Sequence, residues 1–293
     1  MALTILTDLF SQSVVEDAVR AAIKAGMPAL TALPGVAEIR GGLPNGRENV
    51  GSTINIPYFA GLGAYETIST DGDALTPVKL TSTAEQATVQ HFGKAVQMTK
   101  LAQISGSGDP EAEVTKQLMQ GFVHAIDDAL IVAASANSGG AWDAYTNNVT
   151  SSVAFSWDGY VDSRAKFGDE SDDIVGLAVH SATENYTMKI KDSTGMPLYV
   201  APRDENAPAR WAGKRLAVSD KLAPAVGLYN TLILKRNALV AWVDESAMRL
   251  VLEYDELTDS IIMAVHLYLI VHRYNKISGR TKPGVVHYKH GLA

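Results

Sequence analysis

The clearest hydrophobic pattern in the chain lies between Pro110 and Ser135. Apolar residues recur there every three or four positions, the spacing of one helix face: Val114, Leu118, Phe122, Ile126, Leu130 and Ala133. Asp109 can cap such a helix, and Pro110 suits its first turn. The pattern predicts a long helix of about 40 Å at 1.5 Å per residue, a spine on which other elements pack.

Two stretches that favour β-strands, 52–59 and 86–98, precede this helix. More than twenty residues rich in Gly, Thr, Asp and Ala separate them, and few of these are large and apolar. A long two-stranded hairpin with so little core is not stable alone. Loops of this length are typically functional or packed against another surface. The pattern predicts an extended hairpin that something outside the segment must cover.

The rest of the chain mixes helical and strand patterns, which predicts an α+β fold class. An amphipathic helix is expected to begin at Thr7, and Gly and Pro residues break the chain at 40–46. Further short helices are expected at 157–167 and 184–191. The expected strands are 174–180, 216–218, 231–235, 238–242, 249–254, 260–274 and 285–289.

Composition narrows the class of protein. Apolar residues make up 46% of the 293 positions and charged residues 19%, enough to build a core. Cysteine is absent, which excludes disulfides, thiolate metal sites and a cysteine nucleophile. The net charge of −7 argues against binding nucleic acid by phosphate neutralisation, and the short cluster of Lys276, Arg280 and Lys282 is interpreted as a solvated strand edge. We expect no secretory signal and no membrane span.

Candidate chemistry is sparse. The segment 61–66 begins like a dinucleotide-binding fingerprint but lacks the third glycine and the following helix. His266 and His272 would share a strand face, yet they lie farther apart in sequence than a usual metal-binding pair. No catalytic motif is found, so we expect no catalytic, cofactor-binding or metal-binding residues and no enzyme activity. An α/β enzyme is the alternative of a different class, and it would require a convergent polar pocket.

Six segments, in chain order, resemble the major capsid proteins of tailed bacteriophages with the Hong Kong 97-like fold, which encapsulin shells share. GSTINIP at 51–57 is similar to the entry into that family's extended loop, and GKAVQMT at 93–99 to its exit. Residues 109–130 resemble the spine helix. The remaining similarities are GLAVHS at 176–181, which opens the axial domain, WAGKRLAVSD at 211–220, a glycine-led strand, and 272–286, the closing strands.

The resemblance implies a division into four parts. Residues 1–45 would form an N-terminal arm, and 46–99 the extended loop, a β-hairpin. Residues 100–148 with 259–293 would form a peripheral domain that carries the spine helix. Residues 149–258 would form an axial domain.

The resemblance also implies a function. The chain would be the structural subunit of an icosahedral phage head, assembling in the host cytoplasm into pentamers and hexamers that enclose double-stranded DNA without sequence-specific contacts. Its partners would be copies of itself, portal and decoration proteins, and a scaffold expected to be a separate protein. The hairpin would lie across a neighbouring subunit through Leu62, Tyr65, Ile68, Leu75, Val78 and Leu80. An encapsulin-type compartment is the alternative with the same fold.

Overall fold

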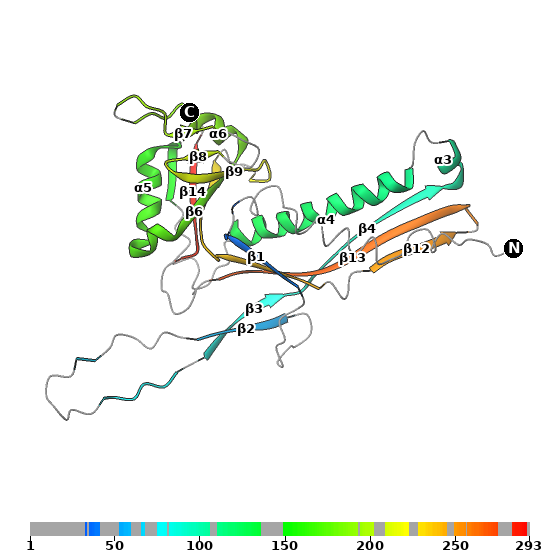
Figure 1. Ribbon diagram of the computed structural model, residues 1–293, viewed down its shortest axis with the longest axis horizontal. Helices are drawn as coiled ribbons and strands as arrows, with labels where there is room; N and C mark the ends of the chain where they lie inside the picture. The colour runs from blue at the N-terminus through cyan, green and yellow to red at the C-terminus, as the bar shows by residue number, and fades with distance from the viewer. Residues whose placement is uncertain are drawn as a thin grey trace.

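The structure is a computed structural model that describes most of the chain after the N-terminal segment. The described residues are 33, 35–41, 53–59, 66–67, 75–80, 82–105, 110–135, 149–192, 194–201, 209–222, 228–244, 249–255, 257–274 and 283–291. Their elements form two larger sheets, a two-stranded hairpin and a long helix (Figure 1). The helix predicted from Thr7 lies outside the described residues.

The five-stranded sheet is organised around β13 (Ser260–Arg273), the longest strand among the described residues. One edge of β13 pairs antiparallel with β4 (Gln90–Thr99). Its other edge pairs with β12 (Arg249–Asp255) and then with β11 (Leu239–Val243), beside which β1 (Ala37–Gly41) runs parallel. From Ile261 to Leu269, buried and partly buried residues of β13 alternate, as in a strand that packs one face on a core.

The seven-stranded sheet forms the second unit, and its strand order is β5-β14-β10-β6-β9-β8-β7. The strands are β5 (Val149–Ala154), β6 (Ile174–Val179), β7 (Tyr199–Val200), β8 (Arg210–Trp211), β9 (Lys214–Val218), β10 (Tyr229–Lys235) and β14 (Val285–Gly291). The short helices α5 (Trp157–Ala165), η2 (Gly168–Asp173) and α6 (Ser181–Thr187) belong to the same unit (Figure 1).

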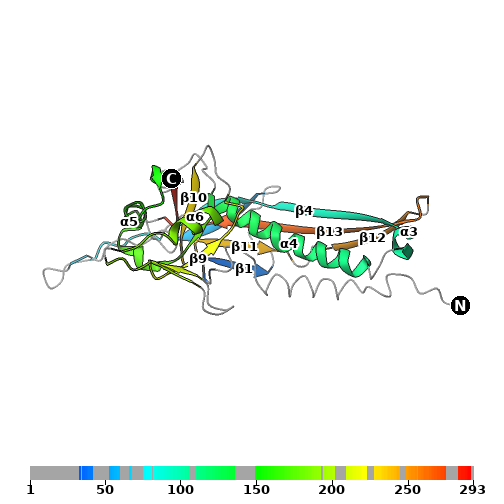
Figure 2. The ribbon, with the colours of Figure 1, turned by 90° about the horizontal axis from the view of Figure 1, so that it is seen from above.

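The long helix α4 (Pro110–Ser135) has the bounds that its apolar stripe predicts. It runs along the five-stranded sheet, and its C-terminal end reaches the seven-stranded sheet (Figures 1 and 2). Ile126 and Leu130 are fully buried in a core to which strands of both sheets contribute. α4 is long and apolar enough to cross a membrane, the only such helix in the described ranges. Its stripe packs against the two sheets, and this packing accounts for its hydropathy.

The seven-stranded sheet has a second, aromatic core. Phe155, Tyr160 and Trp211 meet at ring-centroid separations of about 5 Å, mostly edge to face. Tyr288 of β14 closes this core against α5. Gly159 makes the contact possible, because a Cβ at this position would lie 2.1 Å from the Tyr288 hydroxyl oxygen.

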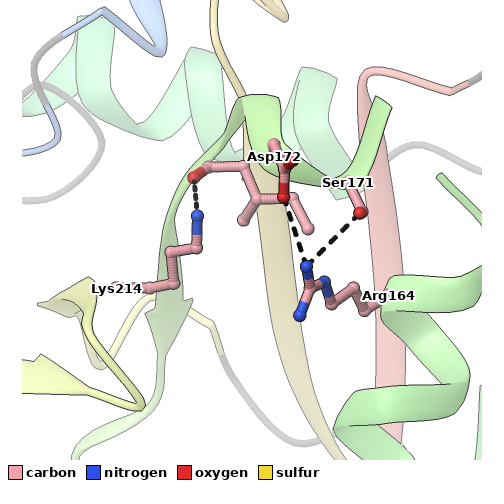
Figure 3. A network of polar contacts seen from close by, with 5 residues as sticks. Arg164, Ser171, Asp172 and Lys214 are labelled. Atoms are coloured by element: carbon pink, nitrogen blue, oxygen red, sulfur yellow. Dashed lines mark hydrogen bonds and ion pairs between the residues drawn. The ribbon is translucent and has the colours of Figure 1, made fainter. Parts of the chain in front are cut away.

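Polar contacts hold α5, η2 and the sheet together (Figure 3). The Arg164 guanidinium of α5 donates to Ser171 Oγ at 3.4 Å and to Asp172 Oδ1 at 3.3 Å. Lys214 of β9 donates to the backbone carbonyl of Ile174 at 2.8 Å, where η2 passes into β6. The acid-rich turn η2 therefore contacts α5, and its junction with β6 contacts β9.

The hairpin consists of β2 (Thr53–Phe59) and β3 (Ser82–Thr88), paired antiparallel. The sequence predicts one strand over 86–98, but the chain changes sheets at Val89: β3 stays in the hairpin and β4 joins β13. A run of strand-favouring residues does not show where the chain passes from one sheet to the next, so the pattern merged the two strands.

Sheet membership also differs from the division expected along the chain. β14, expected with the spine helix, pairs with β10 in the seven-stranded sheet. β11 and β12, expected in the axial domain, pair with β13. Pairing between strands that are distant in sequence determines which sheet each strand joins, and the order of the strands along the chain does not predict that pairing. The helix predicted at 184–191 is α6, which begins earlier because the His180 side chain accepts a hydrogen bond from the Ala182 amide at 3.1 Å.

Candidate assembly surfaces

The described segment 75–80, which leads toward β3 and extends away from both larger sheets (Figure 1), carries exposed apolar side chains. Leu75 is 63% exposed, Val78 64% and Leu80 53%. A hydrogen bond from the Thr76 amide to Glu66 Oε2, at 3.0 Å, joins this segment to residues 66–67. The other three expected interface residues, Leu62, Tyr65 and Ile68, lie outside the described residues. Large apolar groups in water indicate a surface that another molecule covers.

The base of the hairpin differs from this end. Ile54, Ile56 and Ala87 are buried against Val240, Trp242 and Ile270 of the five-stranded sheet. The sequence predicts that another surface must cover the hairpin. At the base of the hairpin, the five-stranded sheet of the same chain is that surface.

A second exposed apolar group lies at the far end of the five-stranded sheet. Helix α3 (Lys100–Ser105) exposes Leu101 by 74% and Ile104 by 75%. The turn between β12 and β13 exposes Leu257 by 98%, and the two segments are joined because the Lys100 amide donates to the Asp259 carbonyl at 2.9 Å. The sequence analysis did not predict α3. Its six residues follow β4 directly and are too few to give a periodic signal.

The C-terminal end of α4 is fastened to both sheets through one carbonyl. The Ala134 oxygen accepts from Arg273 Nη1 at 3.1 Å and from His287 Nε2 at 2.7 Å. Arg273 belongs to β13 and His287 to β14, so the contact joins the two units. Burial is the main cause that lowers the pKa of His287 to about 4; the nearby Arg273 charge acts in the same direction, and the hydrogen bond to Ala134 acts against it. The imidazole is therefore a neutral donor, while Arg273 supplies the cation that a helix C-terminus favours.

The two strand histidines do not form a joint site. His266 Nδ1 lies 3.1 Å from His91 Nε2, whereas His272 Nε2 lies 2.8 Å from Glu85 Oε2. Within the described ranges, no group of three or more His, Asp and Glu side chains could hold a metal ion. The basic cluster and most of the glycine-bearing segment fall outside those ranges. The exposed apolar side chains of segment 75–80 and of α3 are therefore the candidate assembly surfaces.

The fold is similar to those of solved capsid proteins, although the sequence comparisons find no match. No family model matches the chain, and no curated protein matches it significantly. The capsid of a native GTA particle, computed with C5 symmetry, aligns with a TM-score of 0.64 at 11% identity, over 89% of this chain and 90% of that one. The capsid of Ralstonia phage GP4 also aligns at 0.64, with 11% identity and coverage of 88% and 87%. A chain of Mycobacterium phage Cain aligns at 0.59, with 15% identity and coverage of 92% and 91%.

These alignments cover about nine-tenths of this chain and of each matched chain. At 11–15% identity, the comparison shows that the folds are similar and nothing more. The chain has the fold of a tailed-phage major capsid protein.

Proposed function

We propose that the chain is the structural subunit of an icosahedral phage head, which self-assembles into pentamers and hexamers and encloses double-stranded DNA. The observation that carries this proposal is the similarity to capsid subunits over about nine-tenths of both chains. The C5 symmetry of the GTA capsid supports assembly into fivefold rings. The mature protein would reside in the virion and would assemble in the cytoplasm of its host.

The hairpin is the proposed contact with a neighbouring subunit. Leu75, Val78 and Leu80 are exposed in the isolated chain, and we place Leu62, Tyr65 and Ile68 in the same contact. Several hundred Å² of apolar contact per subunit would give several kcal/mol at about 25 cal/mol per Å², before ordering costs. This energy exists only in the shell.

The two sheets support a revised domain proposal. The five-stranded sheet with α3 and α4 would be the peripheral domain, and the seven-stranded sheet with α5 and α6 the axial domain. Residues 1–45 would be the N-terminal arm, and the extended loop would end with β3 rather than at residue 99.

The charge and the partners fit this role. A net charge of −7 lets the wall enclose DNA without attracting it, provided that a motor packs the genome. A separate scaffold, a portal and decoration proteins would complete the particle. The function requires no catalytic residue, cofactor or membrane.

Replacing 61–78 by an Asn-Gly turn tests the proposal. The variant subunit should stay folded and soluble, with the circular dichroism of α4 intact, because the hairpin base keeps its own core. Electron microscopy and light scattering should show shells for the parent chain, expressed with its scaffold if needed, and none for the variant. Normal shells without the loop, or a parent chain that stays a compact monomer at all concentrations and salts, would overturn the proposal.

A further inference from the structure

Two histidines from distant parts of the chain meet on one face of the five-stranded sheet. His91 of β4 and His266 of β13 are 175 residues apart in sequence, yet His91 Nε2 lies 3.1 Å from His266 Nδ1. In the register of the two strands, His91 is opposite Tyr268 and His266 is opposite Gly93. The two histidines are therefore diagonal neighbours, a spacing that ring side chains can bridge.

The pair lies on the side of the sheet that faces away from α4. Val265 and Leu267, on either side of His266, are buried in the core that α4 shares. Because side chains alternate along a strand, His266 points to the opposite face. His91 is exposed and His266 is half-buried, so both imidazoles can be reached from solvent.

The surroundings orient one imidazole and keep the other open. The ring of His91 stacks on Tyr268, with centroids 4.6 Å apart and planes inclined by 11°. Gly93 leaves His266 Nδ1 uncovered, because a Cβ at this position would lie 3.0 Å from that nitrogen. A side chain at position 93 would thus occupy the space in front of His266 Nδ1.

The distance between the two nitrogens is that of two ligands on one metal ion. With bonds of about 2.0–2.1 Å, two nitrogens on the same ion lie about 2.9 Å apart at a right angle and about 3.3 Å apart at the tetrahedral angle. The observed 3.1 Å falls between these values. The ring centroids are 5.2 Å apart, so the rings must pivot for both lone pairs to converge on the ion, and their exposure permits this movement.

A bound ion would replace the hydrogen bond between the rings. In the free pair, one imidazole nitrogen donates a proton and the other accepts it. On binding, the donor ring carries its proton on its other nitrogen, so both lone pairs face the ion and no net proton is released. Water would complete the coordination, since within the described ranges no group of three His, Asp or Glu side chains could hold a metal ion.

We propose that His91 and His266 form a site for a divalent ion of the zinc, nickel and copper class, the ions that imidazole ligands suit. The ion would fasten β4 to β13 close to the point where the chain leaves the hairpin, because His91 follows soon after the end of β3 at Thr88. The proposed function is not required for this inference, since both ligands belong to one chain.

Calorimetric titration of the unassembled full chain with Zn²⁺ at pH 7.5, without a histidine tag, tests the site. The parent chain should bind one ion, and His91→Gln and His266→Gln should each bind it at least tenfold more weakly. His124→Gln removes an exposed histidine of α4 and should bind like the parent. No binding by the parent, a loss in only one of the two ligand variants, or an equal loss in His124→Gln would overturn the proposal.

Thermal unfolding followed by circular dichroism separates lost ligands from a damaged fold. With EDTA present, the parent and all three variants should melt at the same temperature. Zn²⁺ should raise the melting temperature of the parent and of His124→Gln, and leave that of His91→Gln and His266→Gln unchanged. If the two ligand variants melt lower than the parent in EDTA and Zn²⁺ stabilises none of the four proteins, the pair is a structural hydrogen bond and the proposal is wrong.

Discussion

His287 should make the stability of the folded chain fall as the pH drops from 6.5 toward 4. Its imidazole is buried and donates to the Ala134 carbonyl at the end of α4. Replacing His287 by Gln keeps an amide donor of similar reach and removes the titration. The variant therefore separates the hydrogen bond from the protonation.

The sign follows from where the proton binds. The pKa of His287 is lowered from 6.5 to about 4 in the folded chain. Between these two pH values, His287 is therefore protonated in the unfolded chain and neutral in the folded chain. The free energy of unfolding is unaffected above pH 6.5 and falls as the pH drops toward 4. The gap between 6.5 and about 4 corresponds to about 3 kcal/mol at 1.36 kcal/mol per unit.

Urea unfolding of the unassembled subunit between pH 7.5 and pH 4, followed by circular dichroism, measures this effect. The parent chain should lose about 3 kcal/mol more than His287→Gln over the window. Part of the slope should persist in the variant, because burial also lowers the pKa of His290. Parallel pH profiles for the two proteins would refute the assignment of His287 as a buried neutral donor.

Two further predictions concern packing. Ile126→Asp places a charge in the main core and should cost several kcal/mol, enough to prevent soluble expression. Asp128→Ala removes only an exposed ion pair worth about 1 kcal/mol or less. Equal losses of soluble yield and melting temperature in the two variants would show that the buried face of α4 is assigned wrongly. Gly159→Ala drives a Cβ into the Tyr288 hydroxyl and should lower the melting temperature, while Gly121→Ala meets open space and should add about 1 kcal/mol in denaturant unfolding through helix propensity.

The sequence predicts well those elements whose signal is local. The stripe from Val114 to Ala133 and the Asp109–Pro110 start specify α4 because one helix face repeats many times. β13 is similarly found from its long β-branched run, within one residue of its observed end. These signals are contained within the elements themselves.

What the sequence could not supply is pairing between distant segments. The short strands β1, β5, β7 and β8 exist because a neighbour offers a free edge, and their own residues show little alternation. The placement of β14 beside β10 follows from register, Leu234 opposite Val285, which no single segment encodes. The pair of His91 and His266 was missed for the same reason. The two imidazoles become neighbours only when β4 lies beside β13.

The split burial of the hairpin has a consequence for the kinetics and energetics of association. Trp242 and Ile270 hold Ile54, Ile56 and Ala87 before any neighbour arrives, so the direction of the hairpin is set in the free subunit. The entropy of orienting it is then lost during folding, and association has only the outer segment left to order. A buried residue such as Trp242 thus acts as a preorganising element. Loosening it should slow productive encounters between subunits even where the outer apolar side chains are unchanged.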